Sequence, residues 1–333
     1  MATNTELLEA VANTIAEYRD GEICRPDANH VELWLAQFPK NDRDPIISEM
    51  AHVLNQTYFS RKNVLDFIKG LISNEKLAGK NPKPFWKTVN FLRIQANGNS
   101  QNDLLDLFDE SLTSQHGLKT ADCGGGSDYV YLDEVIFTGG RTGNDLEPWI
   151  RNAAPAQATV HVIVMADHTL GCWQMEERLK KAAKSCGKDI TLRIWTCLTL
   201  ESRKAYRNSS DVLWPTSLPE EAKEYAAGKF PFEPRAPGGN SKIFSGEAGR
   251  HALEQALILA GMKIRGFSAN PKAVLRPLGF GPFGVGFGST IVTYRNCPNN
   301  APLAFWWGDP EADKGHPFSK WRPLVPRKTY GGA

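Results

Sequence analysis

The sequence lacks the short motifs that mark most hydrolases, ATPases and zinc enzymes. It contains no G-x-x-x-x-G-K-[ST] loop, no G-x-S-x-G elbow and no H-E-x-x-H pair. Its six cysteines stand singly, without the paired spacing of a zinc site, and its seven histidines do not cluster at metal-ligand spacing. These absences exclude ATP hydrolysis at a Walker site and argue against hydrolase and metalloenzyme chemistry.

The chain also has little net charge and no long apolar run. A formal charge of +2 over 333 residues predicts no strong non-specific binding to nucleic acid or membrane. No stretch approaches the run of about 20 apolar residues that crosses a bilayer, and the N-terminus reads as a polar amphipathic helix rather than a signal peptide. With unpaired cysteines typical of a reducing compartment, we expect a cytoplasmic protein without a membrane partner.

Residues 1–80 are expected to form a helical module. Leu7, Val11 and Ile15 recur at helical spacing, and Asp27 is a candidate N-cap for a second helix. Two more helices are expected at about 45–58 and 61–74. The module either caps the next domain or serves as an oligomerisation surface.

Residues 81–215 alternate strands with helices, after a proline-containing segment (80–84) that suggests a linker. The expected strands are 88–95, 129–132, 159–166 and 190–197, and the expected helices include 102–115 and 170–185. This alternation predicts an α/β fold whose parallel sheet is covered on both faces.

Residues 216–333 are rich in proline, glycine and tryptophan and are expected to form an irregular cap packed on the core. One helix (246–259) and one strand (290–294) interrupt them. The G-x-G-x-x-G match within 279–288 comes late and lacks a preceding strand, so it is weak evidence for a dinucleotide site.

The strongest signal is the stretch Tyr129-Val-Tyr-Leu-Asp-Glu-Val-Ile-Phe-Thr-Gly-Gly-Arg-Thr142. An apolar strand ends in two acids, and a Thr-Gly-Gly-Arg-Thr turn then opens a helix at about Asp145. Backbone N–H groups at a helix N-terminus form an anion cradle, glycines permit close approach, and threonine hydroxyls add donors. Carboxylates at the carboxyl end of a parallel strand lie where open α/β sheets bind ligands. The alternative to a ligand site is a surface turn with an N-cap after an ordinary strand.

This stretch resembles the phosphoribosyl-diphosphate signature of type I phosphoribosyltransferases. The resemblance implies that Asp133 and Glu134 are catalytic, contacting the ribose hydroxyls directly or through Mg²⁺ held by way of substrate or water. The implied binding site for the 5′-phosphate comprises Thr138, Gly139, Gly140, Arg141 and Thr142.

The same family binds pyrophosphate on a loop after its first core strand, and the matching position here is the turn-rich segment 97–101. The implied pyrophosphate site comprises Asn97, Gly98, Asn99, Ser100 and Gln101. Only residues 119–128 then precede the signature strand, which leaves little room for a long catalytic lid. Asp167 and His168, at the end of the next strand, are candidates for the acceptor side of the site, and a structural loop pair is the alternative.

The tail resembles a branch of phosphoribosyltransferase-like proteins found in prokaryotic conflict systems. Its matching segments are Leu213-Trp-Pro215, Arg250 with Glu254, Arg276-Pro-Leu-Gly279, Gly286-Phe-Gly-Ser289, Tyr294-Arg-Asn-Cys-Pro-Asn-Asn300 and Trp321-Arg-Pro-Leu-Val-Pro-Arg327. This resemblance implies an antiviral effector encoded beside an ATPase or a retron reverse transcriptase with its RNA. The tail arginines suit phosphate or nucleic acid, or else belong to a structural cap.

Three functions are therefore open. The first is transfer of phosphoribosyl from its diphosphate to an unidentified acceptor (base, nucleotide, RNA or protein). The second is non-catalytic sensing of a nucleotide or sugar phosphate, and the third is an interaction subunit of an ATPase or retron ribonucleoprotein.

Overall fold

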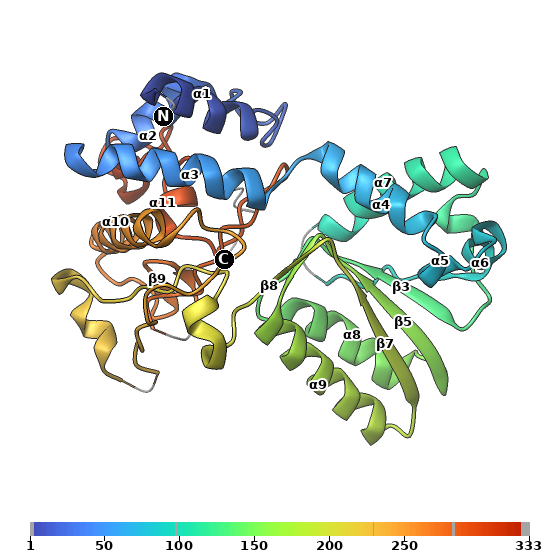
Figure 1. Ribbon diagram of the computed structural model, residues 1–333. Helices are drawn as coiled ribbons and strands as arrows, with labels where there is room; N and C mark the ends of the chain where they lie inside the picture. Colours follow the sequence, from blue (N-terminus) through green and yellow to red (C-terminus); the bar gives the residue numbers. More distant parts are fainter. Residues whose placement is uncertain (1–2, 97–98, 229, 282–283, 328–333) are drawn as a thin grey trace. The chain divides into compact units, whose positions relative to one another are not determined.

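The computed structural model describes residues 3–96, 99–228, 230–281 and 284–327. It divides into two compact units, one made of Met1–Arg61 with Glu201–Ala333 and one made of Lys62–Leu200 (Figure 1). This division differs from the three expected ranges 1–80, 81–215 and 216–333, because the N-terminal helices and the tail belong to one unit. Within the described ranges, no helix is both long enough and apolar enough to cross a membrane.

The Lys62–Leu200 unit is an α/β fold built on a parallel sheet with strand order β2-β3-β5-β7. The strands are β2 (Asn90–Phe91), β3 (Asp128–Leu132), β5 (Gln157–Ile163) and β7 (Asp189–Trp195). A second parallel sheet has the order β4-β6-β8 and contains β4 (Val135–Ile136), β6 (Ala166–His168) and β8 (Leu198–Leu200). Each of its strands closely follows a strand of the larger sheet, so the expected strand 159–166 is divided between β5 and β6.

The helices of this unit lie largely where the sequence predicts them. They are α4 (Arg61–Ile72), α5 (Glu75–Ala78), α6 (Pro82–Thr88), α7 (Ser100–His116), η2 (Thr120–Asp122), α8 (Gly140–Asn152) and α9 (Thr169–Ser185).

The linker expected at 80–84 and the strand expected at 88–95 are wrong in part. Pro82 begins α6 and Pro84 lies within its first turn, where a proline ring is compatible with a helix because the first N–H groups have no intrahelical acceptor. Because α6 continues to Thr88, the strand begins later than expected, and β2 covers only Asn90 and Phe91. Farther along, the N–H groups of Ile94 and Gln95 bond to the Gln101 side chain instead of to a strand.

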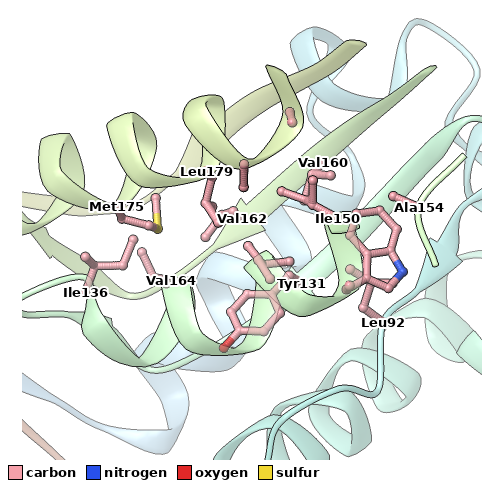
Figure 2. Packing of buried hydrophobic residues seen from close by; sticks show 14 residues of the cluster. Leu92, Tyr131, Ile136, Ile150, Ala154, Val160, Val162, Val164, Met175 and Leu179 are labelled. Carbon is pink, nitrogen blue, oxygen red and sulfur yellow. The ribbon is translucent and has the colours of Figure 1, made fainter. Parts of the chain in front are cut away.

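One face of the larger sheet carries the hydrophobic core under α8 and α9. Figure 2 shows Met175 and Leu179 of α9 directed toward Val162 and Val164. On the other face an aromatic cluster joins α6, α7 and β2, in which the Trp86, Phe91 and Phe108 rings lie 5.2–6.1 Å apart. The sheet is therefore covered on both faces, as the alternation of strands and helices predicts.

The other unit is helical and is built from both ends of the chain. Its elements are α1 (Asn4–Thr14), α2 (Ala28–Leu35), η1 (Lys40–Asp42), α3 (Arg43–Thr57), β1 (Tyr58–Phe59), η3 (Lys204–Ser209), η4 (Glu220–Ala226), α10 (Glu247–Arg265), β9 (Leu275–Arg276), β10 (Gly279–Phe280), β11 (Val292–Thr293), α11 (Leu303–Trp306) and η5 (Pro317–Lys320). Strand β1 pairs in parallel with β11, and the indoles of Trp34 and Trp321 both donate to the Ala304 carbonyl. The Asp27 carboxylate caps α2 by accepting from the His30 N–H, as expected.

A buried carboxylate organises the interior of this unit. Glu254 of α10 is fully buried and accepts hydrogen bonds from the Trp214 N–H (2.9 Å), Arg250 (2.8 Å) and Arg235 (3.0 Å). Arg250 in turn donates to Ser210 and to the Val212 carbonyl. Leu213-Trp-Pro215 and the Arg250–Glu254 pair, which carry part of the family resemblance, therefore build the interior of this unit.

We predict that Glu254→Gln lowers the free energy of unfolding by roughly 3–5 kcal/mol, because it leaves buried guanidinium groups without their counter-charge. The measurement is chemical denaturation followed by tryptophan fluorescence. The matched control is Glu247→Gln, which removes the other, partly exposed partner of Arg235 and should cost much less. Equal losses in the two variants would contradict this account.

Candidate functional site

The site is centred on Asp133, the residue that follows β3. Its carboxylate is 2% exposed, and Oδ1 accepts from the Glu134 N–H (2.8 Å) and the Ser100 hydroxyl (3.3 Å). Ser100 is the first residue of α7, and Arg141, whose Nη1 lies 3.9 Å from Oδ1 of Asp133, is the second residue of α8. The structure thus brings together the acid of the signature, its Thr-Gly-Gly-Arg turn and the loop before α7.

The second oxygen of the Asp133 carboxylate accepts no hydrogen bond within the described structure. Oδ2 of Asp133 is buried and has no hydrogen-bond partner among the described residues. Burial raises the pKa of Asp133 to about 6, and the nearby Asp145 adds to this effect. Arg141, the Glu134 N–H and Ser100 act in the opposite direction without cancelling it. A desolvated carboxylate with an unused oxygen is a group suited to a ligand that supplies positive charge or hydroxyl donors.

The signature turn starts α8 directly, five residues earlier than the helix start expected at Asp145. Gly139 is the N-cap with φ +73°, a left-handed conformation that favours glycine. A Cβ here would lie 2.3 Å from the Gly171 carbonyl oxygen, and a Cβ at Gly171 would lie 1.8 Å from that of Phe137. Both glycines are therefore needed for α9 to approach the turn closely. This contact fixes the N-terminus of α8, whose first N–H groups have no acceptor within the helix.

The side chains of the turn divide between surface and interior. Thr138 and Arg141 are exposed, and the Thr138 hydroxyl accepts from the Gly140 N–H. Thr142 is buried. The Thr138 and Arg141 side chains are therefore accessible from solvent, whereas the Thr142 side chain is not.

The loop before α7 is held by a pair of glutamines. The side-chain Oε1 of Gln101 accepts from the N–H groups of Ile94 and Gln95. The Gln95 side chain accepts from the Gln101 N–H and donates to Ser100. Gln101 is buried, so its side chain positions the loop rather than facing a ligand. Asn99 is the N-cap of α7, whereas Asn97 and Gly98 lie outside the described residues.

Sequence reasoning missed a second buried acid beside the site. Asp145 of α8 accepts from the Tyr131 hydroxyl (2.7 Å) and the Ala96 N–H (3.3 Å), so it ties α8 to β3 and to the loop before α7. No clear signal in the sequence marks this burial, because the helix is expected to begin at about Asp145, whereas α8 begins at Gly140 and carries Asp145 one turn further on.

Asp167 and His168, expected on the acceptor side, lie in β6 and are buried. Oδ1 of Asp167 accepts from the Thr199 hydroxyl (2.7 Å), and burial raises the pKa of its carboxyl. Nδ1 of His168 lies 3.0 Å from the Ile136 carbonyl, and its ring stacks on Phe137. These contacts suit a structural pair, and an acceptor-side role stays a prediction.

The connection between α7 and β3 is short, as expected. It covers residues 117–127 and contains only the single turn η2. Across the described part of the chain, no three His, Cys, Asp or Glu side chains come together as a metal site.

The acid lies between two helix N-termini at the carboxyl end of a parallel strand, which is where open α/β sheets bind ligands. The family model PRTase-CE matches residues 31–327. The chain therefore belongs to the PRTase-CE family, which is a phosphoribosyltransferase-type family. At the level of the family, it is a transferase-like protein. No curated protein matches it.

We predict that Asp133→Asn stabilises the protein in a pH-dependent way. A pKa raised from 3.8 to about 6 means that the ionised carboxylate destabilises the fold, by roughly 3 kcal/mol at 1.36 kcal/mol per pH unit. The wild type loses this amount as the pH rises from about 4 to about 6, whereas neutral asparagine does not. Paired denaturation curves at pH 4 and pH 8 measure the difference, and an identical difference at both pH values would refute the assignment.

Proposed function

We propose that this protein binds phosphoribosyl diphosphate together with Mg²⁺ at Asp133 and transfers phosphoribosyl to an acceptor. The observation that carries the proposal is the buried Asp133 carboxylate, whose Oδ2 has no partner among the described residues and which lies between the N-termini of α7 and α8. A carboxylate beside two anion-binding helix ends matches a ligand that has a ribose diol flanked by phosphates.

Different residues of the site bind different parts of the ligand. Asp133 and Glu134 accept hydrogen bonds from the ribose hydroxyls, and the turn from Thr138 to Thr142 holds the 5′-phosphate through its N–H groups and the Thr138 hydroxyl. The loop from 97 to 101 holds the pyrophosphate, with Ser100 as the side-chain donor. Arg141 is exposed and within reach of both Asp133 and Ser100, so it supplies positive charge between them.

Mg²⁺ fits this donor set. Mg²⁺ is commonly held by one or two carboxylates plus substrate phosphates, and Asp133 offers one unused oxygen. When bound, the ion would neutralise charge on the departing pyrophosphate. The chain's own contribution is to orient the ribose through the two acids and to stabilise the pyrophosphate through fixed N–H donors.

A sensor that binds the same ligand without turnover is the second candidate. The short connection between α7 and β3 favours it, because little chain is available there to close over a reacting centre and exclude water. In either form we place the protein in prokaryotic antiviral defence, working beside an ATPase or a retron reverse transcriptase with its RNA. This placement rests on the tail segments that resemble the conflict-system branch.

Calorimetric titration of phosphoribosyl diphosphate with Mg²⁺ tests the proposal. We predict that the wild type binds and that Asp133→Asn binds roughly 10- to 100-fold more weakly, because a charged hydrogen-bond acceptor is lost. The control is Asp128→Asn, at the other end of β3, about 16 Å away along the strand. Asp128→Asn should bind like the wild type.

Folded wild type that fails to bind would overturn the proposal. Since Asp133→Asn is expected to be at least as stable as the wild type near neutral pH, weaker binding cannot be attributed to unfolding. Release of pyrophosphate in the presence of candidate acceptors then distinguishes a transferase from a sensor, because only turnover releases it.

A further inference from the structure

Strand β7 is the last strand of the larger sheet, and one of its edges is open. The Asp189 N–H donates to the Ala156 carbonyl, and the Trp195 carbonyl accepts from the Val164 N–H. Because backbone groups alternate in direction along a strand, the odd-numbered residues face β5. Ile190, Leu192 and Ile194 then direct their N–H and C=O groups away from the sheet, where no strand of the described chain pairs with them.

This edge lacks a bulge, a proline and a lysine, which are among the devices that prevent strand pairing. The register with β5 runs without interruption from Gln157↔Asp189 to Ile163↔Trp195, so β7 has no bulge, and residues 189–195 contain no proline or lysine. Long, regular edge strands without such protection are templates for another strand. The alternative is that the exposed side chains of Asp189 and Arg193 protect the β7 edge from pairing by their charges.

The order of side chains along β7 favours one partner, namely a second copy of β7. In an antiparallel pair centred on Thr191, Asp189 of one copy lies directly opposite Arg193 of the other, and the reverse pair repeats by symmetry. On the opposite face, Ile190 lies opposite Leu192 of the second copy. Opposite charges and apolar pairs placed directly across an antiparallel ladder stabilise it.

The backbone agrees with this register. With Thr191 at the two-fold axis, Ile190 and Leu192 of the two copies are opposite each other, and they are the residues whose N–H and C=O groups are directed outward. They can exchange both hydrogen bonds of a narrow antiparallel pair. Their half-buried side chains already pack against the core under α8 and α9, so pairing would continue that core into the second copy.

We propose that two copies of this protein associate through β7, antiparallel and centred on Thr191, to form one continuous sheet. The interface is isologous, since each copy contributes the same strand. It lies in the Lys62–Leu200 unit and uses none of the residues of the Asp133 site, so the proposal stands independently of the proposed function.

A charge exchange tests the partner and the register together. Arg193→Asp places two acids opposite each other at both symmetric positions, and Asp189→Arg does the same with two bases. Each single variant should weaken dimerisation by about tenfold, and Asp189→Arg/Arg193→Asp should restore it. Sedimentation of the full chain over a range of concentrations provides the measurement.

A cross-link tests the geometry. Thr191 residues facing each other at a non-hydrogen-bonded position have Cα atoms about 4.5 Å apart, within the range of a disulfide. Thr191→Cys should therefore form an oxidised dimer in excess of the wild-type background from native cysteines. Asp189→Cys should not, since the two Asp189 positions would lie about 13 Å apart along the ladder.

A wild type that stays monomeric at every concentration would overturn the proposal. So would a dimer that is indifferent to both single charge variants, or one that cross-links through residue 189 as readily as through residue 191. These outcomes can be distinguished from a loss of folding, because the double variant Asp189→Arg/Arg193→Asp keeps the same two residues and only exchanges their positions.

Discussion

The arrangement around the site depends on the cost of holding an ionised carboxylate out of water. Asp133 is enclosed at the end of β3, and burial raises its pKa to about 6. The charge is only partly offset, by Arg141, whose Nη1 lies 3.9 Å away, and by the Glu134 N–H and Ser100. A buried acid with one unsatisfied oxygen is tolerated when its surroundings are rigid enough to prevent its escape to solvent. The ionised Asp133 carboxylate therefore lowers the stability of the free protein, and a ligand that pairs with it would restore that stability.

That rigidity comes from contacts within the protein on both sides of the site. The Gln95–Gln101 pair fixes the loop before α7, and Asp145 links α8 to β3 and to the same loop. On the far side, Gly139 and Gly171 allow α9 to approach the signature turn at a distance that any side chain would prevent. The helix N-termini are therefore pre-positioned, and an anion would meet N–H groups that need little rearrangement.

The sequence predicts the parts of this fold that are encoded locally. The Asp27 N-cap, the strand before Asp133 and the turn that opens α8 all depend on residues a few positions apart. The expected strand 88–95 is longer than β2, in part because prolines at the start of α6 resemble a linker, and only tertiary packing distinguishes the two. The Tyr131–Asp145 bond and the burial of Gln101 depend on elements meeting in space, which periodicity does not report. The same holds for the three donors that converge on Glu254.

The long-range contacts also explain why the chain ends and the core are organised separately. The unit containing Glu254 is completed only when residues before Arg61 pair with the tail, as β1 does with β11. The α/β core is one continuous stretch between those two segments, and its own hydrophobic core under α8 and α9 contains only its own residues. Because the buried Glu254 network lies wholly in the first unit and the Asp133 site wholly in the second, changes in one set of buried charges need not alter the other. A loss of stability at Glu254 and a loss of binding at Asp133 are therefore separable in the same full-length chain.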